Sequence, residues 1–324
     1  GTVTDHGAGE VITGGAGSDT IRFTSTTPND TLTFHAGVTG VDSVVIGTAA
    51  GVTTGITALN VDASAVGSGL FLTGNNGANA LTGTAQADTL SGNAGNDTLT
   101  GGGGNDTLDG GLGQDTVNGG TGDDRITMLV TVGNVDTIDA GTGTDTLVLS
   151  GVVPGNHVVE VDLGASDQVV SIGSVLENHC LQSNFENLDA SGLGGSVQVT
   201  GSDVDNIIIG SNGNDIIDGG AGNDTLTGGA GADNLQGGAD NDLFLLGAVA
   251  EFAADERIDG GANTDTLRYT GTTAATLTLT NLVTGLEQVQ TASAAGDASG
   301  TAAININAAA VGNGLSISGN AGNN

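Results

Sequence analysis

Aspartates recur at nine-residue intervals between Gly83 and Asp124, and this spacing is the most regular chemical feature of the sequence. Five units follow one another without a gap and read GTAQADTLS, GNAGNDTLT, GGGGNDTLD, GGLGQDTVN and GGTGDDRIT. Each unit has glycine first, an acidic residue sixth and an aliphatic residue eighth. A strict period of this kind indicates a solenoid, in which each repeat stacks on its neighbours.

The residue types at these positions suit a hard divalent cation. Glycines at positions one, two and four permit positive φ and leave backbone carbonyls uncovered, so a tight turn can direct several carbonyls at one point. The aspartate at position six supplies negative charge. Carboxylate and carbonyl oxygens, without sulfur or imidazole, favour Ca²⁺ over zinc or copper. We therefore predict that the chain binds several Ca²⁺ ions as its cofactor.

If two units form one coil, units eighteen residues apart stack on the same side of the solenoid. Asp97 would then share ions with Asp115 and Asn79, and Asp106 would share ions with Asp88 and Asp124. One aliphatic side chain per nine residues is a thin core, so we expect poor folding without Ca²⁺. The alternative is a solenoid whose aspartates merely occupy turns, but turn preference does not explain an acid at every ninth position behind glycine.

The predicted calcium ligands are the array aspartates and the glycine carbonyls around them. The aspartates are Asp19, Asp88, Asp97, Asp106, Asp115, Asp124, Asp136, Asp145, Asp215, Asp224, Asp233, Asp242 and Asp265. The carbonyls belong to Gly92, Gly95, Gly101, Gly102, Gly104, Gly110, Gly111, Gly113, Gly119, Gly120, Gly122, Gly210, Gly213, Gly219, Gly220, Gly222, Gly228, Gly229 and Gly231.

The nine-residue pattern divides the chain into arrays and spacers. The arrays are residues 1–22, 74–148 with a short insertion, 201–269 with a longer one, and 319–324, where the chain stops partway through a unit. The spacers are residues 23–73, 149–200 and 270–318, in which short β-rich runs alternate with turn residues. We predict an all-β fold: a parallel β-roll or β-helix solenoid whose calcium-binding arrays alternate with calcium-free spacer coils. The chain reads as a fragment of one long rod.

Composition limits the partners. The net charge is −33, with four arginines and no lysine, so nucleic acid and anionic membranes are poor partners. A generally acidic surface would explain this charge but not its spacing. The single cysteine, Cys180, excludes an internal disulfide, and no apolar run approaches the roughly 18 residues that a membrane span needs.

The nonapeptide G-G-x-G-x-D-x-U-x resembles the repeat of the RTX family of secreted bacterial proteins. The resemblance implies a parallel β-roll with Ca²⁺ between stacked turns, export by a type I system and an extracellular location at the bacterial cell surface. The spacers resemble, more weakly, those of RTX-type surface-layer proteins. A strand followed by Asp-Ala-Ser occurs at Val61–Ser64 and Leu188–Ser191, whereas Asn307–Ala309 departs from this pattern.

We predict a non-enzymatic role as a calcium-rigidified rod segment of a bacterial surface-layer protein or large adhesin. Its expected partners are calcium, further copies in a surface array, or cell-surface polysaccharide. The alternative is a non-catalytic carrier or folding module of a secreted enzyme or toxin whose active domain lies outside this chain. Interleaved spacers favour the first interpretation, because the carrier array of an enzyme tends to be one block.

Other candidate sites have simpler explanations. His179 beside Cys180 lacks the further ligands of a zinc site, and Tyr269 beside Arg268 is the only tyrosine available for catalysis in a β-helix cleft. Threonine recurs at position seven and is expected to point outward, where it could bind ice but is better explained by β-propensity. No zinc-protease, nucleophile-elbow or Walker A motif is present.

Overall fold

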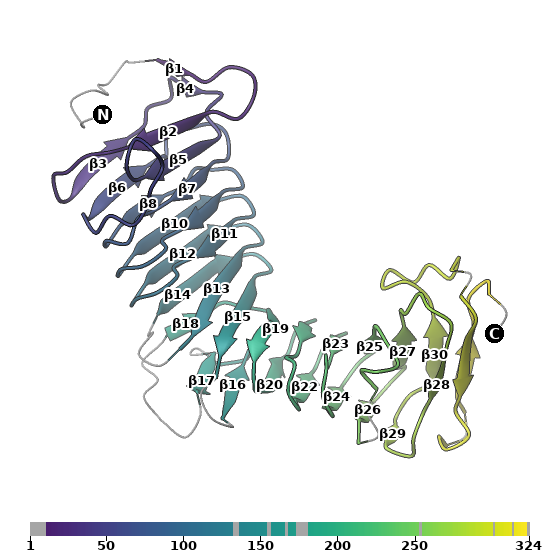
Figure 1. The fold of residues 1–324 in the computed structure, drawn as a ribbon. Coiled ribbons are helices and arrows are strands. Elements are labelled where there is room, and N and C mark those ends of the chain that lie inside the picture. Colours follow the sequence, from purple (N-terminus) through teal and green to yellow (C-terminus); the bar gives the residue numbers. More distant parts are fainter. Residues whose placement is uncertain are drawn as a thin grey trace. The chain divides into compact units, whose positions relative to one another are not determined.

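A computed structural model describes residues 11–131, 136–153, 157–165, 168–172, 181–252, 255–300, 302–312 and 314–322 (Figure 1). Every regular element in these residues is a β-strand. The chain forms two compact units: unit 1 comprises residues 1–148 and 178–185, and unit 2 comprises residues 149–177 and 186–324. Among the described residues, no helix is long and apolar enough to cross a membrane.

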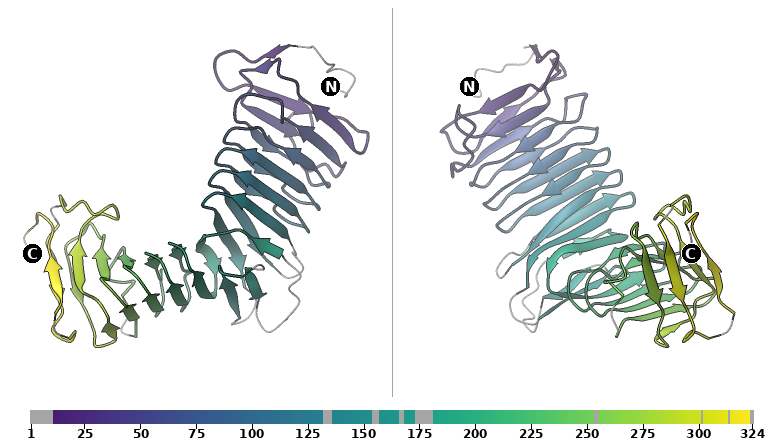
Figure 2. Two further views of the ribbon diagram at one scale, coloured as in Figure 1. Left: turned by 180° about the vertical axis from the view of Figure 1, so that it is seen from behind. Right: turned by 45° about the vertical axis from the view of Figure 1, so that its right-hand side comes forward.

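The strands of unit 1 alternate between two parallel sheets, which Figure 2 shows from two further directions. One sheet contains β3 (Asp30–Thr33), β6 (Leu59–Asp62), β8 (Ala80–Thr82), β10 (Thr98–Gly103), β12 (Thr116–Thr121), β14 (Thr137–Thr142) and β18 (Leu181–Ser183). The other contains β2 (Thr20–Phe23), β5 (Ser43–Ile46), β7 (Phe71–Thr73), β9 (Thr89–Ser91), β11 (Thr107–Asp109), β13 (Arg125–Val130) and β15 (Thr146–Val152). A short parallel pair joins β1 (Ile12–Thr13) to β4 (Val38–Thr39).

The register confirms that two nonapeptides make one coil. Thr98 of β10 pairs with Thr116 of β12, and Thr107 of β11 pairs with Arg125 of β13, so partners lie eighteen residues apart. Thr116 pairs with Thr137 across the short insertion, which therefore adds residues to one coil without ending the stack. Spacer strands belong to the same sheets, since β6 pairs with both β3 and β8.

Unit 2 repeats the two-sheet arrangement. One sheet contains β19 (Asn187–Gly194), β21 (Ile207–Ile209), β23 (Thr225–Thr227), β25 (Leu243–Leu246), β27 (Thr266–Tyr269), β30 (Gln288–Thr291) and β32 (Ser316–Ser318). The other contains β17 (Val169–Ile172), β16 (Val158–Asp162), β20 (Ser196–Ser202), β22 (Ile216–Gly220), β24 (Asn234–Gly238), β26 (Arg257–Gly261) and β29 (Val283–Thr284). A separate pair joins β28 (Ala275–Thr278) to β31 (Ile304–Asn307). Only β16 and β17 pair antiparallel among the described strands, so the predicted parallel β-solenoid is confirmed.

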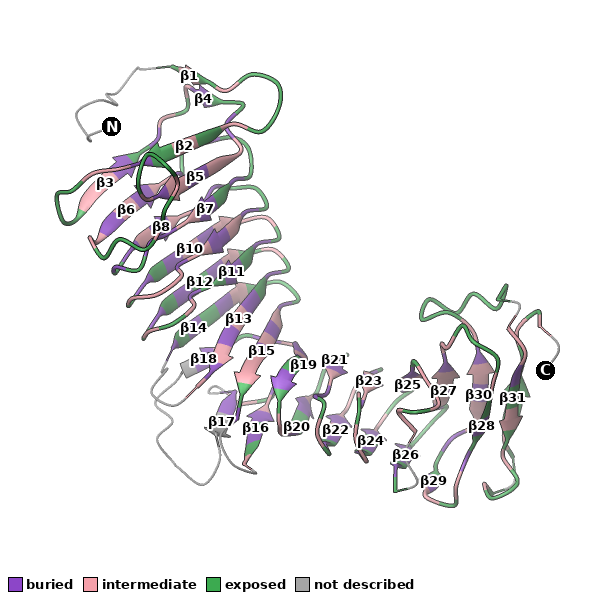
Figure 3. Ribbon diagram, in the orientation of Figure 1, coloured by how far each residue is buried: buried purple, intermediate pink, exposed green. Residues whose placement is uncertain are grey.

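The core is built mainly on the position-eight side chains of the array strands, and β13 buries Met128 and Val130 in addition to Ile126. Leu90, Leu108 and Ile126 form one column in register, and all three are buried. Threonines at position seven, such as Thr98 and Thr107, lie on the exposed side of their strands as predicted. Figure 3 shows this alternation of buried and exposed residues along the array strands. The fold therefore depends on the loops as much as on its apolar interior.

Candidate calcium sites

The array acids lie in the loops that precede the strands, where they form ladders along each unit. In unit 1, Asp97 Oδ1 accepts a hydrogen bond from the backbone N–H of Asn79 at 2.7 Å, and Asp115 Oδ1 accepts one from Asp97 at 2.8 Å. Asp136 continues this ladder. A second ladder runs through Asp88, Asp106, Asp124 and Asp145. The eighteen-residue register therefore brings each acid to the backbone of the preceding coil.

Unit 2 contains the same two ladders. Asn206, Asp224, Asp242 and Asp265 form one, with N–H to Oδ1 distances of 2.8 to 2.9 Å. The other joins Asp215 and Asp233 to Glu256, whose Oε2 accepts from the N–H of Asp233 at 3.0 Å. Glu256 thus occupies an acidic slot although a longer insertion precedes it.

The second carboxylate oxygen of many array acids is buried without a hydrogen-bond partner. Among the described residues this holds for Oδ2 of Asp19, Asp97, Asp106, Asp115, Asp124, Asp224, Asp233, Asp242 and Asp265. Burying a charged oxygen without a partner costs several kcal/mol, roughly, and is uncommon in folded proteins. These oxygens therefore need a cation or a proton.

The glycine at position one leaves open the space into which these oxygens point. A Cβ built on Gly92 would collide with Asp97 Oδ2 and with the carbonyl oxygen of Gly110 in the next coil. A Cβ on Gly219 would collide in the same way with Asp224 Oδ2 and the carbonyl of Gly237. The predicted carbonyls that approach the preceding coil in this manner are those of Gly92, Gly101, Gly110, Gly119, Gly219 and Gly228.

Glycine is also needed at positions two and four, because carbonyl oxygens of the preceding coil lie where a Cβ would be. A Cβ on Gly120 would collide with the carbonyl oxygen of Gly102, and a Cβ on Gly122 with that of Gly104. The predicted carbonyls that approach the following coil are those of Gly95, Gly102, Gly104, Gly120, Gly122, Gly213 and Gly220. The Gly220 carbonyl also accepts a hydrogen bond from Ala239. The remaining predicted glycines, Gly111, Gly113, Gly210, Gly222, Gly229 and Gly231, lie in the same set of loops.

Burial makes these carboxylates reluctant to ionise without a counter-charge. Desolvation raises the pKa of Asp97, Asp106 and Asp224 to about 7, although a backbone hydrogen bond to each opposes the shift. The pKa of Glu256 rises to about 8 for the same reason. Neighbouring carboxylates add to these shifts.

The donor set fits calcium. Among the described residues, no group of three or more His, Cys, Asp and Glu side chains could hold a metal ion. An ion in these loops must therefore be held by backbone carbonyls together with few carboxylates, which suits Ca²⁺ and not zinc. Bound Ca²⁺ would supply the positive charge that the unpartnered oxygens lack.

Three acids that continue the ladders were not among the predicted ligands. Besides Glu256, Asp42 Oδ2 accepts from the N–H of Asp19 at 2.7 Å, and Glu287 Oε2 accepts from the N–H of Asp265 at 2.8 Å. Asp42 and Glu287 occupy the same place in the matching segments VTGVDSV and VTGLEQV, which begin at Val38 and Val283. That internal match is the signal that could have identified them.

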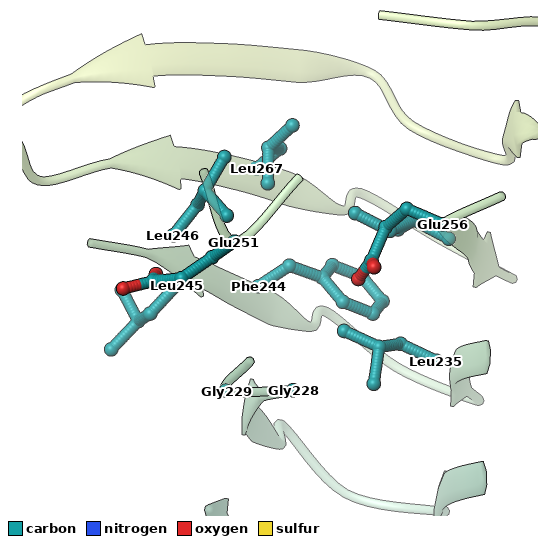
Figure 4. A pocket seen from close by; sticks show the side chains of 10 residues that line it. Gly228, Gly229, Leu235, Phe244, Leu245, Leu246, Glu251, Glu256 and Leu267 are labelled. Carbon is teal, nitrogen blue, oxygen red and sulfur yellow. The ribbon is translucent and has the colours of Figure 1, made fainter. Parts of the chain in front are cut away.

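Glu256 also lies beside a small cavity in unit 2. Figure 4 shows its carboxylate next to Phe244 and Leu235, and Leu246 and Leu267 line the same cavity. Glu251 lies nearby, but its carboxylate accepts hydrogen bonds from the N–H groups of Gly247 and Ala248. The apolar surroundings explain why burial dominates the pKa shift of Glu256.

The other candidate residues contribute little to a site. Tyr269 is buried, with 1% of its surface exposed, and Arg268 binds Gln290 and the carbonyl of Ala294. His179 and Cys180 lie outside the described residues, so their prediction stays untested.

These stacked loops, with their acids and open glycine carbonyls, define a β-solenoid of the calcium-binding class. A family model described as RTX calcium-binding nonapeptide repeat (4 copies) matches residues 7–22, 73–108, 91–126, 200–235 and 222–248. The chain therefore carries RTX calcium-binding nonapeptide repeats, as the sequence pattern predicted, and repeats of this family bind calcium. Comparison with curated proteins found no match.

Proposed function

We propose that this chain is a non-catalytic, calcium-rigidified segment of a secreted bacterial surface-layer protein or large adhesin. The observation that carries the proposal is the ladder of buried carboxylates whose Oδ2 atoms have no hydrogen-bond partner. Asp97, Asp106, Asp224 and the equivalent acids would hold Ca²⁺ together with glycine carbonyls of the adjacent coil. Glu256, Asp42 and Glu287 extend the same ladders.

Calcium would couple the folding of this chain to its location. The net charge of −33 opposes compaction until cations neutralise it. Extracellular calcium modules bind their ions at roughly 10⁻⁴ to 10⁻³ M, so loops of this kind stay empty at cytosolic calcium levels and fill outside the cell. We infer that the chain is exported in a poorly folded state and becomes rigid after secretion.

A structural role follows from how the loops and sheets are combined. The calcium ladders run parallel to sheets that contain both array and spacer strands, so each ion would tie neighbouring coils together. Stacked coils with repeated outer faces suit lateral association with further copies or attachment to cell-surface polysaccharide. The proposal needs no catalytic residue.

Electron microscopy of the purified chain in millimolar calcium and in chelator tests the structural role. We expect calcium-dependent filaments or sheets, with dispersed particles in chelator. Dispersed particles under both conditions would favour a carrier module of a secreted enzyme or toxin instead. Magnesium at the same concentration is the control, because it prefers water and a stricter octahedral geometry.

A further inference from the structure

The residue at position two divides thirteen of the array loops into two kinds, with nine loops in one and four in the other. In one kind this residue has positive φ, between 76° and 112°, and the acid four residues later keeps Oδ2 without a partner. The position-two residues of this kind are Gly15, Asn93, Gly102, Gly111, Gly120, Gly220, Gly229, Gly238 and Gly261. Asn93 shows that the backbone conformation, and not glycine itself, marks this kind of loop.

The second kind of loop closes on itself by hydrogen bonds. Its position-two residues are Asn75, Thr84, Ser202 and Ser211, none of which has positive φ. The N–H of Thr84 donates to Asp88 Oδ2 at 2.6 Å, and that of Ser211 donates to Asp215 Oδ2 at 2.7 Å. The Thr84 hydroxyl also donates to Asp88 Oδ2, at 2.9 Å. The Ser211 hydroxyl lies 2.8 Å from Asp215 Oδ1 and 2.5 Å from the carbonyl oxygen of Gly195, and it has one proton for these two acceptors. The N–H of Leu70 donates to Asp88 Oδ1, and the N–H of Val197 donates to Asp215 Oδ1. Both oxygens of each carboxylate therefore have a hydrogen-bond partner within the protein.

The two loops with asparagine in the acidic slot are satisfied in the same way. Asn79 Oδ1 accepts from the N–H of Asn75 at 2.7 Å, while its Nδ2 donates to the carbonyl of Leu59 at 2.8 Å. Asn206 Oδ1 accepts from the N–H of Ser202, and its Nδ2 donates to the carbonyl of Glu186. An amide therefore brings neutral N–H donors, and no negative charge, to the place of a carboxylate.

These four loops occupy equivalent places in the two arrays. Residues 74–79 and 83–88 form the first coil of one array, and residues 201–206 and 210–215 form the first coil of the other; we name them the opening coils. The change to positive φ comes at Asn93 in unit 1 and at Gly220 in unit 2. Two arrays of different sequence thus begin with the same hydrogen-bonded coil.

We propose that the opening coils bind no calcium and act as hydrogen-bonded caps from which the calcium-binding coils continue. This proposal rests on the proposed function, in which the loops with unpartnered Oδ2 atoms hold the ions. It removes Asp88 and Asp215 from the predicted ligands, although both occupy the acidic position of their nonapeptides. The physical reason is that N–H and O–H donors already occupy the oxygens that an ion would need.

Bound calcium in matched variants of the full chain tests this proposal. Asp88→Asn and Asp215→Asn should leave the amount of calcium bound at saturation unchanged. Asp106 lies one coil after Asp88, and Asp224 lies one loop after Asp215. Asp106→Asn and Asp224→Asn should each lower the amount of calcium bound at saturation. Equilibrium dialysis measures the bound ion, and circular dichroism in saturating calcium shows that each variant remains folded. Equal losses from Asp88→Asn and Asp106→Asn would overturn the proposal.

Crystals of the unaltered chain soaked in Tb³⁺ give a second test that does not depend on variant folding. Anomalous scattering should place ions beside Asp106 and Asp224 and none beside Asp88 and Asp215. Ions beside all four would refute the calcium-free caps while supporting the proposed function. Ions beside none of the four would refute the proposed function itself, so the two failures are distinguishable.

Discussion

At the scale of single residues, the nonapeptide glycines are required mainly by neighbouring backbone. Positive φ alone would favour glycine, but the loops also place carbonyl oxygens where a Cβ would lie. Asp240 and Asn263 occupy position four with φ of 73° and 81°, so positive φ by itself does not exclude a side chain. The close approach of coils therefore explains the strictest glycine positions.

A matched pair of alanine substitutions separates these two effects. Gly120→Ala combines positive φ with a collision against the carbonyl of Gly102, whereas Gly17→Ala has positive φ and open space around the new Cβ. We expect Gly17→Ala to cost about 1 kcal/mol and Gly120→Ala clearly more. Thermal unfolding in calcium measures both, and equal losses would show that backbone strain alone selects glycine.

The raised carboxylate pKa values predict an unusual pH dependence for the calcium-free chain. Burial raises the pKa of Asp97 from 3.8 to about 7, so the folded state binds protons more tightly than the unfolded state. The stabilisation is complete below the unfolded pKa and disappears as pH rises through the folded pKa. In chelator, circular dichroism should therefore show more β structure at pH 5 than at pH 8. Greater stability at pH 8 would contradict the shifts.

At the scale of strands and loops, an array strand such as β11 places an exposed threonine next to a buried aliphatic residue. Leu108 is fully buried, and its neighbour Thr107 faces outward. Leu108→Ala should cost about 2 to 4 kcal/mol of unfolding free energy in calcium, because it opens a cavity in a thin core. Thr107→Ala is the control and should cost less than about 1 kcal/mol. Urea unfolding of the two variants checks this, and similar losses would argue against a stabilising role for the buried column of position-eight side chains.

Much at this scale could be predicted from the sequence. The nine-residue period sets the eighteen-residue register, the buried aliphatic column and the ladders of acids. The difference between Asp88 and Asp106 was not predicted, although their units differ at position two, which is Thr84 in one and Gly102 in the other. Residue type alone does not settle the loop conformation, because Asn93 at the same position has positive φ. Asn307 replaces the aspartate of the Asp-Ala-Ser pattern, but the turn is retained. Asn307 Oδ1 accepts a hydrogen bond from the N–H of Ala309, as Asp62 Oδ1 does from the N–H of Ser64.

At the scale of the whole chain, the negative charge opposes folding and bound calcium would offset it. The chain has 37 acidic and 4 basic side chains and a thin apolar core. Carboxylates concentrated in ladders would repel one another without cations. Each bound Ca²⁺ would remove two of these charges and join adjacent coils. Folding and ion binding are therefore expected to be a single linked equilibrium.

Far-ultraviolet circular dichroism of the chain during calcium titration tests this linkage most directly. The account predicts little β signal in chelator at neutral pH, a cooperative gain at roughly millimolar calcium, and no comparable gain in magnesium. A full β signal in chelator at neutral pH, unchanged by added calcium, would contradict it.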